Sequence, residues 1–119
     1  MILIVDDDPT FLEDARQILN RDRQVFFASD SKRAVALAGD LGFSVVLVNL
    51  DLRYEDGLVL IRDLRTRFSG LPIIAMTASR HHTLIELAKE FGAIEILRKP
   101  ITPEWKPIVE RARAMSARA

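Results

Sequence analysis

Short apolar runs and longer amphipathic segments alternate along this chain. Short runs bounded by polar residues are typical of buried β-strands. The first four runs are nearly continuous, which predicts strands covered on both faces, whereas Glu95 makes the last run alternate and places it nearer a sheet edge. The five runs lie at residues 2–5, 25–28, 45–48, 73–76 and 94–97.

Each run is followed by a segment whose apolar residues recur at helical spacing, with one apolar face on an otherwise polar helix. Asp8 before Pro9 and Asp30 before the second segment are typical helix N-caps. Gly42 and Gly92 are expected to end the second and fourth helices. The apolar stripes lie within residues 11–19, 34–41, 58–68, 84–91 and 105–115.

The order is therefore strand then helix, five times over. This alternation predicts a single α/β domain over residues 1–119, a three-layer doubly wound fold with a parallel sheet between helices. In such sheets ligands bind outside the carboxyl ends of the strands.

Composition narrows the function classes. The 119 residues hold 17 basic and 17 acidic side chains, so the formal net charge is zero and no basic patch suggests direct contact with nucleic acid. Cysteine is absent, which excludes disulfides and thiolate chemistry and fits a reducing, cytoplasmic setting. No apolar run is long enough for a membrane span, and three aspartates interrupt the N-terminal run where a signal peptide would continue.

Residues with reactive or ligating side chains follow four of the five predicted strands. Taken singly, each residue suits an ordinary structural role: Asp8 that of a helix cap, Thr77 that of a strand end and Lys99 that of a solvated side chain. Because the carboxyl ends of parallel strands meet at one edge, we expect one pocket there. Its candidate residues are Asp6, Asp7, Asn49, Asp51, Thr77 and Lys99.

Neighbouring carboxylates repel one another unless a cation lies between them. Lys99 supplies one positive charge, and Mg²⁺, which prefers carboxylate oxygens, water and phosphate, would supply two. A hydroxyl and an ammonium beside such an ion suit the binding of phosphoryl oxygens. By contrast, His81 and His82 are expected to be a solvated pair, and Trp105 to pack in the core.

Five segments carry a resemblance to a known family: residues 3–8, 45–57 and 73–78, Gly92 with Ala93, and Lys99 with Pro100. Together they resemble the receiver domain of two-component response regulators, and the resemblance covers the whole chain. The resemblance implies a CheY-like, flavodoxin-like fold with sheet order 2-1-3-4-5. It also implies that Asp6 and Asp7 form the acidic pair that holds Mg²⁺, that Thr77 is the hydroxyl residue, and that the bond from Lys99 to its proline is often cis.

One departure from the family is decisive for function. The family's phosphoacceptor aspartate lies eight residues before the glycine that opens the third helix, and this count from Gly57 reaches Asn49. Asp51 stands where a backbone carbonyl usually ligates the metal. Arg53 and Tyr54 replace the usual loop proline, and Ile96 replaces a frequent switch aromatic.

An amide is not a useful nucleophile toward phosphorus, because its nitrogen lone pair is delocalised and its oxygen is neutral. We therefore expect a receiver-like signalling module, not an enzyme, that is not phosphorylated at the usual position and has a weakened Mg²⁺ site. An alternative makes Asp51 the acceptor, since residues two apart on an extended strand face the same side. A deliberate replacement of aspartate would also leave Asn49, although the altered loop favours natural divergence.

The resemblance implies protein partners, namely a sensor kinase or a downstream effector, and allows a homodimer through the fourth helix, fifth strand and fifth helix. A second family offers another function. The sequence from Asp6 to Thr10 also fits the D-x-D-x-T motif of haloacid-dehalogenase-type phosphatases, which use the first aspartate as nucleophile. The short chain and the lack of a cap insertion disfavour that enzyme.

Overall fold

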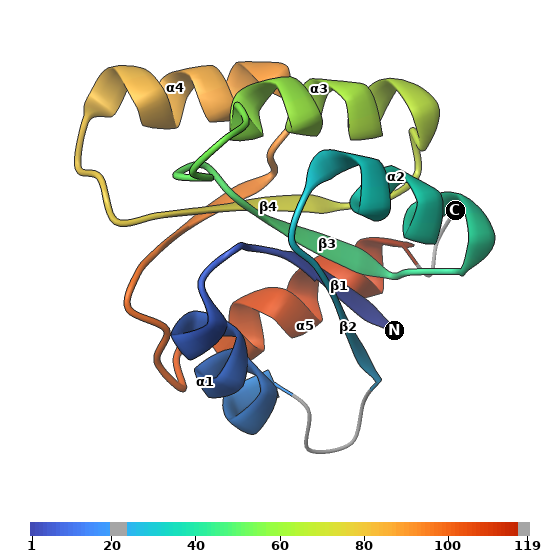
Figure 1. The fold of residues 1–119 in the computed structure, drawn as a ribbon, viewed down its shortest axis with the longest axis horizontal. Coiled ribbons are helices and arrows are strands. Elements are labelled where there is room, and N and C mark those ends of the chain that lie inside the picture. The colour runs from blue at the N-terminus through green and yellow to red at the C-terminus, as the bar shows by residue number, and fades with distance from the viewer. Residues whose placement is uncertain (20–23, 117–119) are drawn as a thin grey trace.

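The predicted strands pair in parallel, in the order β2-β1-β3-β4-β5, in a computed structural model that describes residues 1–19 and 24–116. Both the fold class and the strand order are confirmed (Figure 1). The strands are β1 (Ile2–Val5), β2 (Val25–Ala28), β3 (Val45–Asn49), β4 (Ile73–Thr77) and β5 (Glu95–Arg98). The helices are α1 (Pro9–Leu19), α2 (Ser31–Asp40), α3 (Gly57–Arg67), α4 (His82–Phe91) and α5 (Trp105–Ser116).

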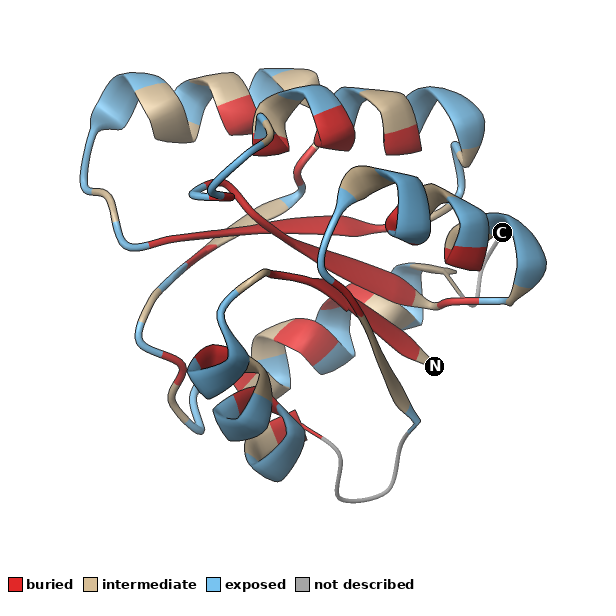
Figure 2. Ribbon diagram, in the orientation of Figure 1, coloured by how far each residue is buried: buried red, intermediate tan, exposed pale blue. Residues whose placement is uncertain are grey.

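Alternate residues of the central strands face opposite sides of the sheet, as the pleat requires. In β1, Leu3 and Val5 join the core formed with α2, α3 and α4. Ile2 and Ile4 join the second core, formed with α1 and α5. Figure 1 shows these helices on the two sides of the sheet, and Figure 2 shows the central strands buried between them.

The two edge strands differ from the central ones. β5 lies at an edge, as its alternating sequence predicts. The second run is covered on both faces as predicted, since its side chains pack in both cores, but β2 forms the other edge of the sheet and only Ala28 of that strand is buried. Its apolar side chains Val25, Phe26 and Phe27 are half-buried against neighbouring helices and strands.

Helix ends follow local side-chain chemistry. The Asp30 carboxylate accepts a hydrogen bond from the Arg33 amide at 2.8 Å, and that of Asp8 accepts one from the Thr10 amide at 3.0 Å, so both predicted N-caps are confirmed. Gly92 ends α4 with φ 137°, also as predicted. Gly42 does not end α2 in this way.

The α2 helix instead stops at Asp40 with an extended Leu41 as its C-cap, and the only described glycine with positive φ is Gly92. Extended backbone needs no glycine, because any residue adopts it. A glycine just beyond an apolar stripe was therefore an incomplete signal for this helix end.

The start of α5 supports the core beneath the carboxyl edge. Trp105 is buried and its ring lies 5.9 Å from that of Phe11, which confirms its packing role. Before it, a hydrogen bond from Thr102 holds the pKa of the Glu104 carboxyl below its ordinary value.

Within the described residues, no helix combines the length and apolar character needed to cross a bilayer.

Candidate functional site

Parallel pairing brings the predicted site residues to one edge of the sheet. Asn49 is the last residue of β3 and pairs with Met76, one residue before the end of β4 at Thr77. Asp6 directly follows β1, and Lys99 directly follows β5. Three of these side chains are almost fully buried, since Asp6, Asn49 and Thr77 expose 0%, 2% and 0% of their surface.

Asp6 and Lys99 form an ion pair across the sheet, with 2.6 Å between Lys99 Nζ and Asp6 Oδ2. The other carboxylate oxygen of Asp6 accepts the Asp8 amide at 2.9 Å, so both oxygens have donors. The ammonium also lies 4.3 Å from the centroid of the Phe11 ring, a cation–π contact. The cis peptide bond between Lys99 and Pro100 confirms the family-based prediction.

Asp7 faces the loop that follows β3. Its Oδ2 accepts a hydrogen bond from the Arg53 amide at 2.9 Å. The acidic pair is therefore divided between two partners: Asp6 holds the lysine and Asp7 holds the loop.

Asn49 uses its side chain locally. Its Oδ1 accepts the Asp51 amide at 3.0 Å, which is an Asx turn, in which an Asn side chain bonds to the backbone two residues on. The Lys99 ammonium pairs with Asp6 instead of this amide. A buried, neutral and hydrogen-bonded amide thus stands at the end of β3.

Asp51 projects toward β4. Thr77 Oγ1 lies 3.2 and 3.1 Å from the two Asp51 carboxylate oxygens, and the Ala78 amide donates to Oδ2 at 2.9 Å. The extended course assumed for the strand beyond Asn49 is wrong, because β3 ends there and the chain turns at Leu50 and Asp51. The turn delivers the carboxylate to the Thr77 hydroxyl, a contact that the strand period does not predict.

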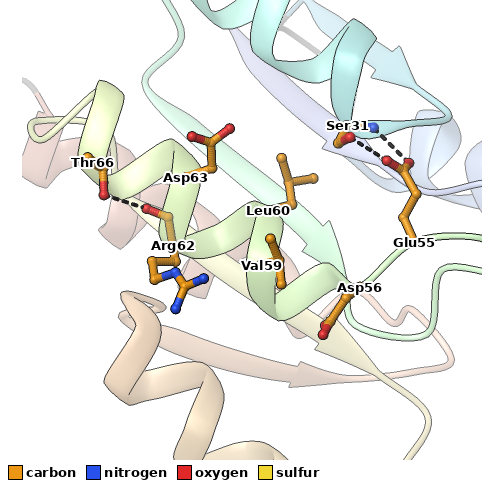
Figure 3. A pocket seen from close by; sticks show the side chains of 8 residues that line it. All are labelled: Ser31, Glu55, Asp56, Val59, Leu60, Arg62, Asp63 and Thr66. Carbon is orange, nitrogen blue, oxygen red and sulfur yellow. Dashed lines mark hydrogen bonds between the residues drawn. The ribbon is translucent and has the colours of Figure 1, made fainter.

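The β3–α3 loop (residues 50–56) is fastened at several further points. Glu55 accepts hydrogen bonds from both the backbone amide and the hydroxyl of Ser31, at the start of α2 (Figure 3). Asp56 caps α3 by accepting the Leu58 amide at 2.9 Å. The contact between Glu55 and Ser31 could not be predicted from the sequence, since the two residues lie 24 positions apart.

At Gly57 the end of the β3–α3 loop packs against the start of the same loop. A Cβ atom at this position would lie 2.4 Å from the Asn49 carbonyl oxygen and 2.9 Å from Leu50 Cα. Only glycine permits this approach of two backbones. The start of α3 is therefore held directly against the end of β3.

A groove of about 430 Å³ runs beside this loop between α2 and α3, and Figure 3 shows its lining side chains. Glu55 and Asp56 border it, but the predicted site residues do not. His81 and His82 are exposed at the start of α4, and the described residues contain no group of three or more His, Cys, Asp and Glu side chains placed to hold a metal.

The chemistry of the donor set is compatible with a weak Mg²⁺ site. Asp6 and Asp7 offer carboxylate oxygens of the type that Mg²⁺ prefers. However, both oxygens of Asp6 and one of Asp7 already accept hydrogen bonds, and the third side chain at this edge is the neutral Asn49. Metal binding would have to exchange some of these partners for the ion.

Comparison with known proteins gives the family. Residues 2–107 match the model of the response regulator receiver domain. The chain is 33% identical over 114 residues to the DNA-binding response regulator MtrA of Mycolicibacterium smegmatis and 34% identical over 123 residues to the transcriptional regulatory protein AruR of Pseudomonas aeruginosa. These alignments cover 95% and 98% of the chain but 49% of each relative, so the chain spans about half the length of these curated relatives.

Solved structures agree on the fold. A CheY-like receiver domain protein from Methanospirillum hungatei superposes with a TM-score of 0.87 at 24% identity, covering 99% of this chain and 97% of that one. The signal receiver domain of an HD domain-containing protein from Pseudomonas fluorescens gives a TM-score of 0.91 at 23% identity, covering 98% and 88%. With the family model matched over nearly the whole chain, this protein belongs to the response regulator receiver domain family of two-component signal transduction.

Proposed function

We propose that this chain is an atypical receiver module that is not phosphorylated at the usual position and acts through protein contacts. The single observation that carries the proposal is Asn49. Asn49 stands at the end of β3 and is 2% exposed, and its side-chain oxygen accepts a hydrogen bond from the Asp51 backbone amide. It follows the family's spacing from Gly57.

Formation of an acyl phosphate requires a carboxylate oxygen that attacks phosphorus and displaces the leaving group of the donor. The amide of Asn49 has no anionic oxygen, and its nitrogen lone pair is delocalised. The neighbouring parts of a phosphoryl site are nevertheless present, since Thr77 supplies a hydroxyl and Lys99 an ammonium. The site thus keeps groups that stabilise negative charge but lacks the acceptor.

Asp51 supports the alternative in which a different carboxylate takes the phosphoryl group. It is exposed and lies on the same edge of the sheet. Against this role, its oxygens accept hydrogen bonds from Thr77 and Ala78, the donors that would otherwise be free for the transferred group. In-line transfer is sensitive to displacements of about 1 Å, which also disfavours an acceptor two residues along the chain.

We propose a weakened Mg²⁺ site at Asp6 and Asp7, with the backbone carbonyl of Asp51 as a further oxygen ligand. When bound, the ion would neutralise the acidic pair. Asn49 provides less charge than an aspartate would, and Lys99 already neutralises Asp6. These two effects lower the electrostatic gain from binding a divalent ion.

The proposed partners are proteins, either a sensor kinase or a downstream effector, in a cytoplasmic setting. A homodimer through α4, β5 and α5 is a further proposal from the family. The relatives described above are named as DNA-binding and transcriptional regulators. For this chain we propose no direct DNA contact, because its formal net charge is zero, and no catalytic turnover.

Exposure to acetyl phosphate and Mg²⁺, followed by intact mass measurement, tests the proposal. The wild-type chain is expected to keep its mass, whereas Asn49→Asp is expected to gain one phosphoryl group. Asp51→Ala serves as the matched control for the alternative acceptor. Stoichiometric modification of the wild-type chain that is lost in Asp51→Ala would refute the proposal.

The phosphatase alternative is tested separately with a chromogenic phosphate ester and Mg²⁺. Its nucleophile would be Asp6, which is fully buried and hydrogen-bonded through both oxygens. We expect no turnover above that of Asp6→Asn. Turnover that this substitution removes would support the enzyme.

A further inference from the structure

The Asp51 carboxylate fills the hydrogen-bond donors at the end of β4. The Ala78 amide donates to Oδ2 at 2.9 Å, and the Thr77 hydroxyl lies within 3.2 Å of both carboxylate oxygens. One O–H and one N–H aimed at the same point form a small binding site for an oxyanion. In this chain the oxyanion belongs to the protein itself.

The direction of the Thr77 hydroxyl follows from its second partner. Its oxygen accepts the Ser79 amide at 2.9 Å, so its single proton is available for Asp51. Thr77 itself is fully buried, so the partners of its hydroxyl in this conformation are protein groups. The Asp51 carboxylate therefore fixes both the proton and the rotamer of Thr77.

The hydrogen bonds continue from Thr77 to the start of α4. The Ser79 hydroxyl accepts the His81 amide at 3.1 Å, and His81 is the N-cap residue of α4. The His81 side chain makes no capping hydrogen bond. The backbone path from β4 into α4 is thus set by side chains in series, beginning at Asp51.

Asp51 is held in place from both sides. Its own amide is bound by Asn49, and beyond it the Arg53 amide bonds to Asp7 while Glu55 bonds to Ser31. A carboxylate tethered in this way has little conformational freedom left to lose on binding its donors. A free anion would have to compete with a ligand of high effective concentration.

We propose that Asp51 is a built-in anionic ligand that fills the oxyanion site of Thr77 and Ala78 and holds the β4–α4 connection (residues 78–81) in one conformation without any phosphoryl group. This inference rests on the proposed function, in which no phosphoryl group forms on residue 49. It assigns Asp51 the role of a positioning residue that acts through Thr77.

Amide hydrogen exchange and chemical shifts of a ¹⁵N-labelled chain test the inference. In Asp51→Ala, exchange of the Ala78 amide is expected to accelerate about fivefold to tenfold, as expected for the loss of a hydrogen bond to an exposed acceptor. Shifts at Ser79 and His81 are expected to change with it. Asp63→Ala removes another partly exposed carboxylate, on α3, and is expected to keep wild-type values at these amides.

Inorganic phosphate supplies a readout that a merely structural role would not produce. At millimolar concentration it is expected to shift the Ala78 amide and slow its exchange in Asp51→Ala, because its oxygens accept hydrogen bonds from the vacated donors. The wild-type chain is expected to show no such response, and adding Thr77→Val to Asp51→Ala is expected to abolish it. Asp51→Asn, which keeps the shape without the charge, provides a second folded variant for the same titration.

Unchanged Ala78 exchange in Asp51→Ala, or an equal response to phosphate in the wild-type chain, would overturn the inference. Failure of the proposed function has a different signature, because it appears as a mass increase of the wild-type chain with acetyl phosphate. The two failures can therefore be told apart.

Discussion

The site at the carboxyl edge has two halves, which accommodate charge in opposite ways. The first half comes from β1 and β5, where the fully buried carboxylate of Asp6 is neutralised by the Lys99 ammonium at 2.6 Å. The second half comes from β3 and β4, where the buried side chain is the neutral Asn49 and the carboxylate of Asp51 lies at the surface on hydroxyl and amide donors. The first half depends on a charge pair, whereas the second depends on directional hydrogen bonds.

Under the proposed function, this difference describes a phosphoryl site that is altered while its fold stays intact. A neutral Asn49 in place of an aspartate gives less electrostatic repulsion with Asp6 and Asp7. The adjacent loop then supplies a different anion to the donors of β4. Substitutions in the two halves of the site should therefore change the stability of the protein by different amounts.

The largest effect is expected for Lys99→Met. It leaves Asp6 buried without its countercharge, which costs about 3 kcal/mol of the free energy of unfolding. Urea denaturation of the variant and of Lys99→Met with Asp6→Asn measures the coupling. If the double variant were no more stable than the single one, the ion pair would not be the reason for the loss.

Gly57→Ala comes next, because it tests how tightly the loop is closed in the second half. Its Cβ would meet the Asn49 carbonyl oxygen at 2.4 Å, and the resulting shift of α3 is expected to cost about 1–3 kcal/mol. Gly39→Ala is the matched control, since the nearest atom to a Cβ there is a Phe68 ring carbon at 3.9 Å. In helix α2 that substitution is expected to stabilise the protein by up to about 1 kcal/mol, so thermal melts of the two variants should shift in opposite directions.

Asn49→Asp would make the two halves alike. Without metal, a further carboxylate near Asp6 and Asp7 is expected to cost about 1 kcal/mol of stability. Mg²⁺ is expected to reverse this loss and to bind at least about tenfold more tightly than to the wild-type chain, since added ligand charge favours a divalent ion. Calorimetric titration checks the affinity, and equal affinities would show that Asn49 does not weaken the site.

The smallest effect on stability is expected for Asp51→Ala. Asp51 is exposed, so its hydrogen bonds exchange with water and their net contribution is about 1 kcal/mol. Urea denaturation beside Lys99→Met compares the halves directly. A loss as large as that of Lys99→Met would mean that the second half carries as much stability as the first.

The sequence predicted the strands and the edge that they form because apolar runs and strand-end polar residues are local signals. The first two strands have the predicted bounds, and the next two each extend one residue further, to Asn49 and Thr77. The edge position and partial burial of β2 were not predicted, because they depend on the strand neighbours that the topology supplies. An apolar run alone does not specify how many neighbours it has.

Within the site, the contacts divide in the same way. Asn49 bonding to the Asp51 amide is a two-residue motif that its residue type favours, so it could have been predicted. The contact of Glu55 with Ser31 joins two distant segments and has no local signature. The contact of Asp51 with Thr77 required the turn at residues 50–51, which the strand period did not indicate.

The close approach at Gly57 has a consequence for how such domains diversify. Because the β3–α3 loop returns almost to its starting point, it forms a closed excursion from the sheet. Changes of length or composition in such an excursion cost little chain entropy and need not disturb the strands beneath it. We therefore expect that the loop can be replaced while the sheet stays intact. Because residue 49 belongs to β3, a loop grafted from another receiver domain would change the anion offered to Thr77 without changing the acceptor position.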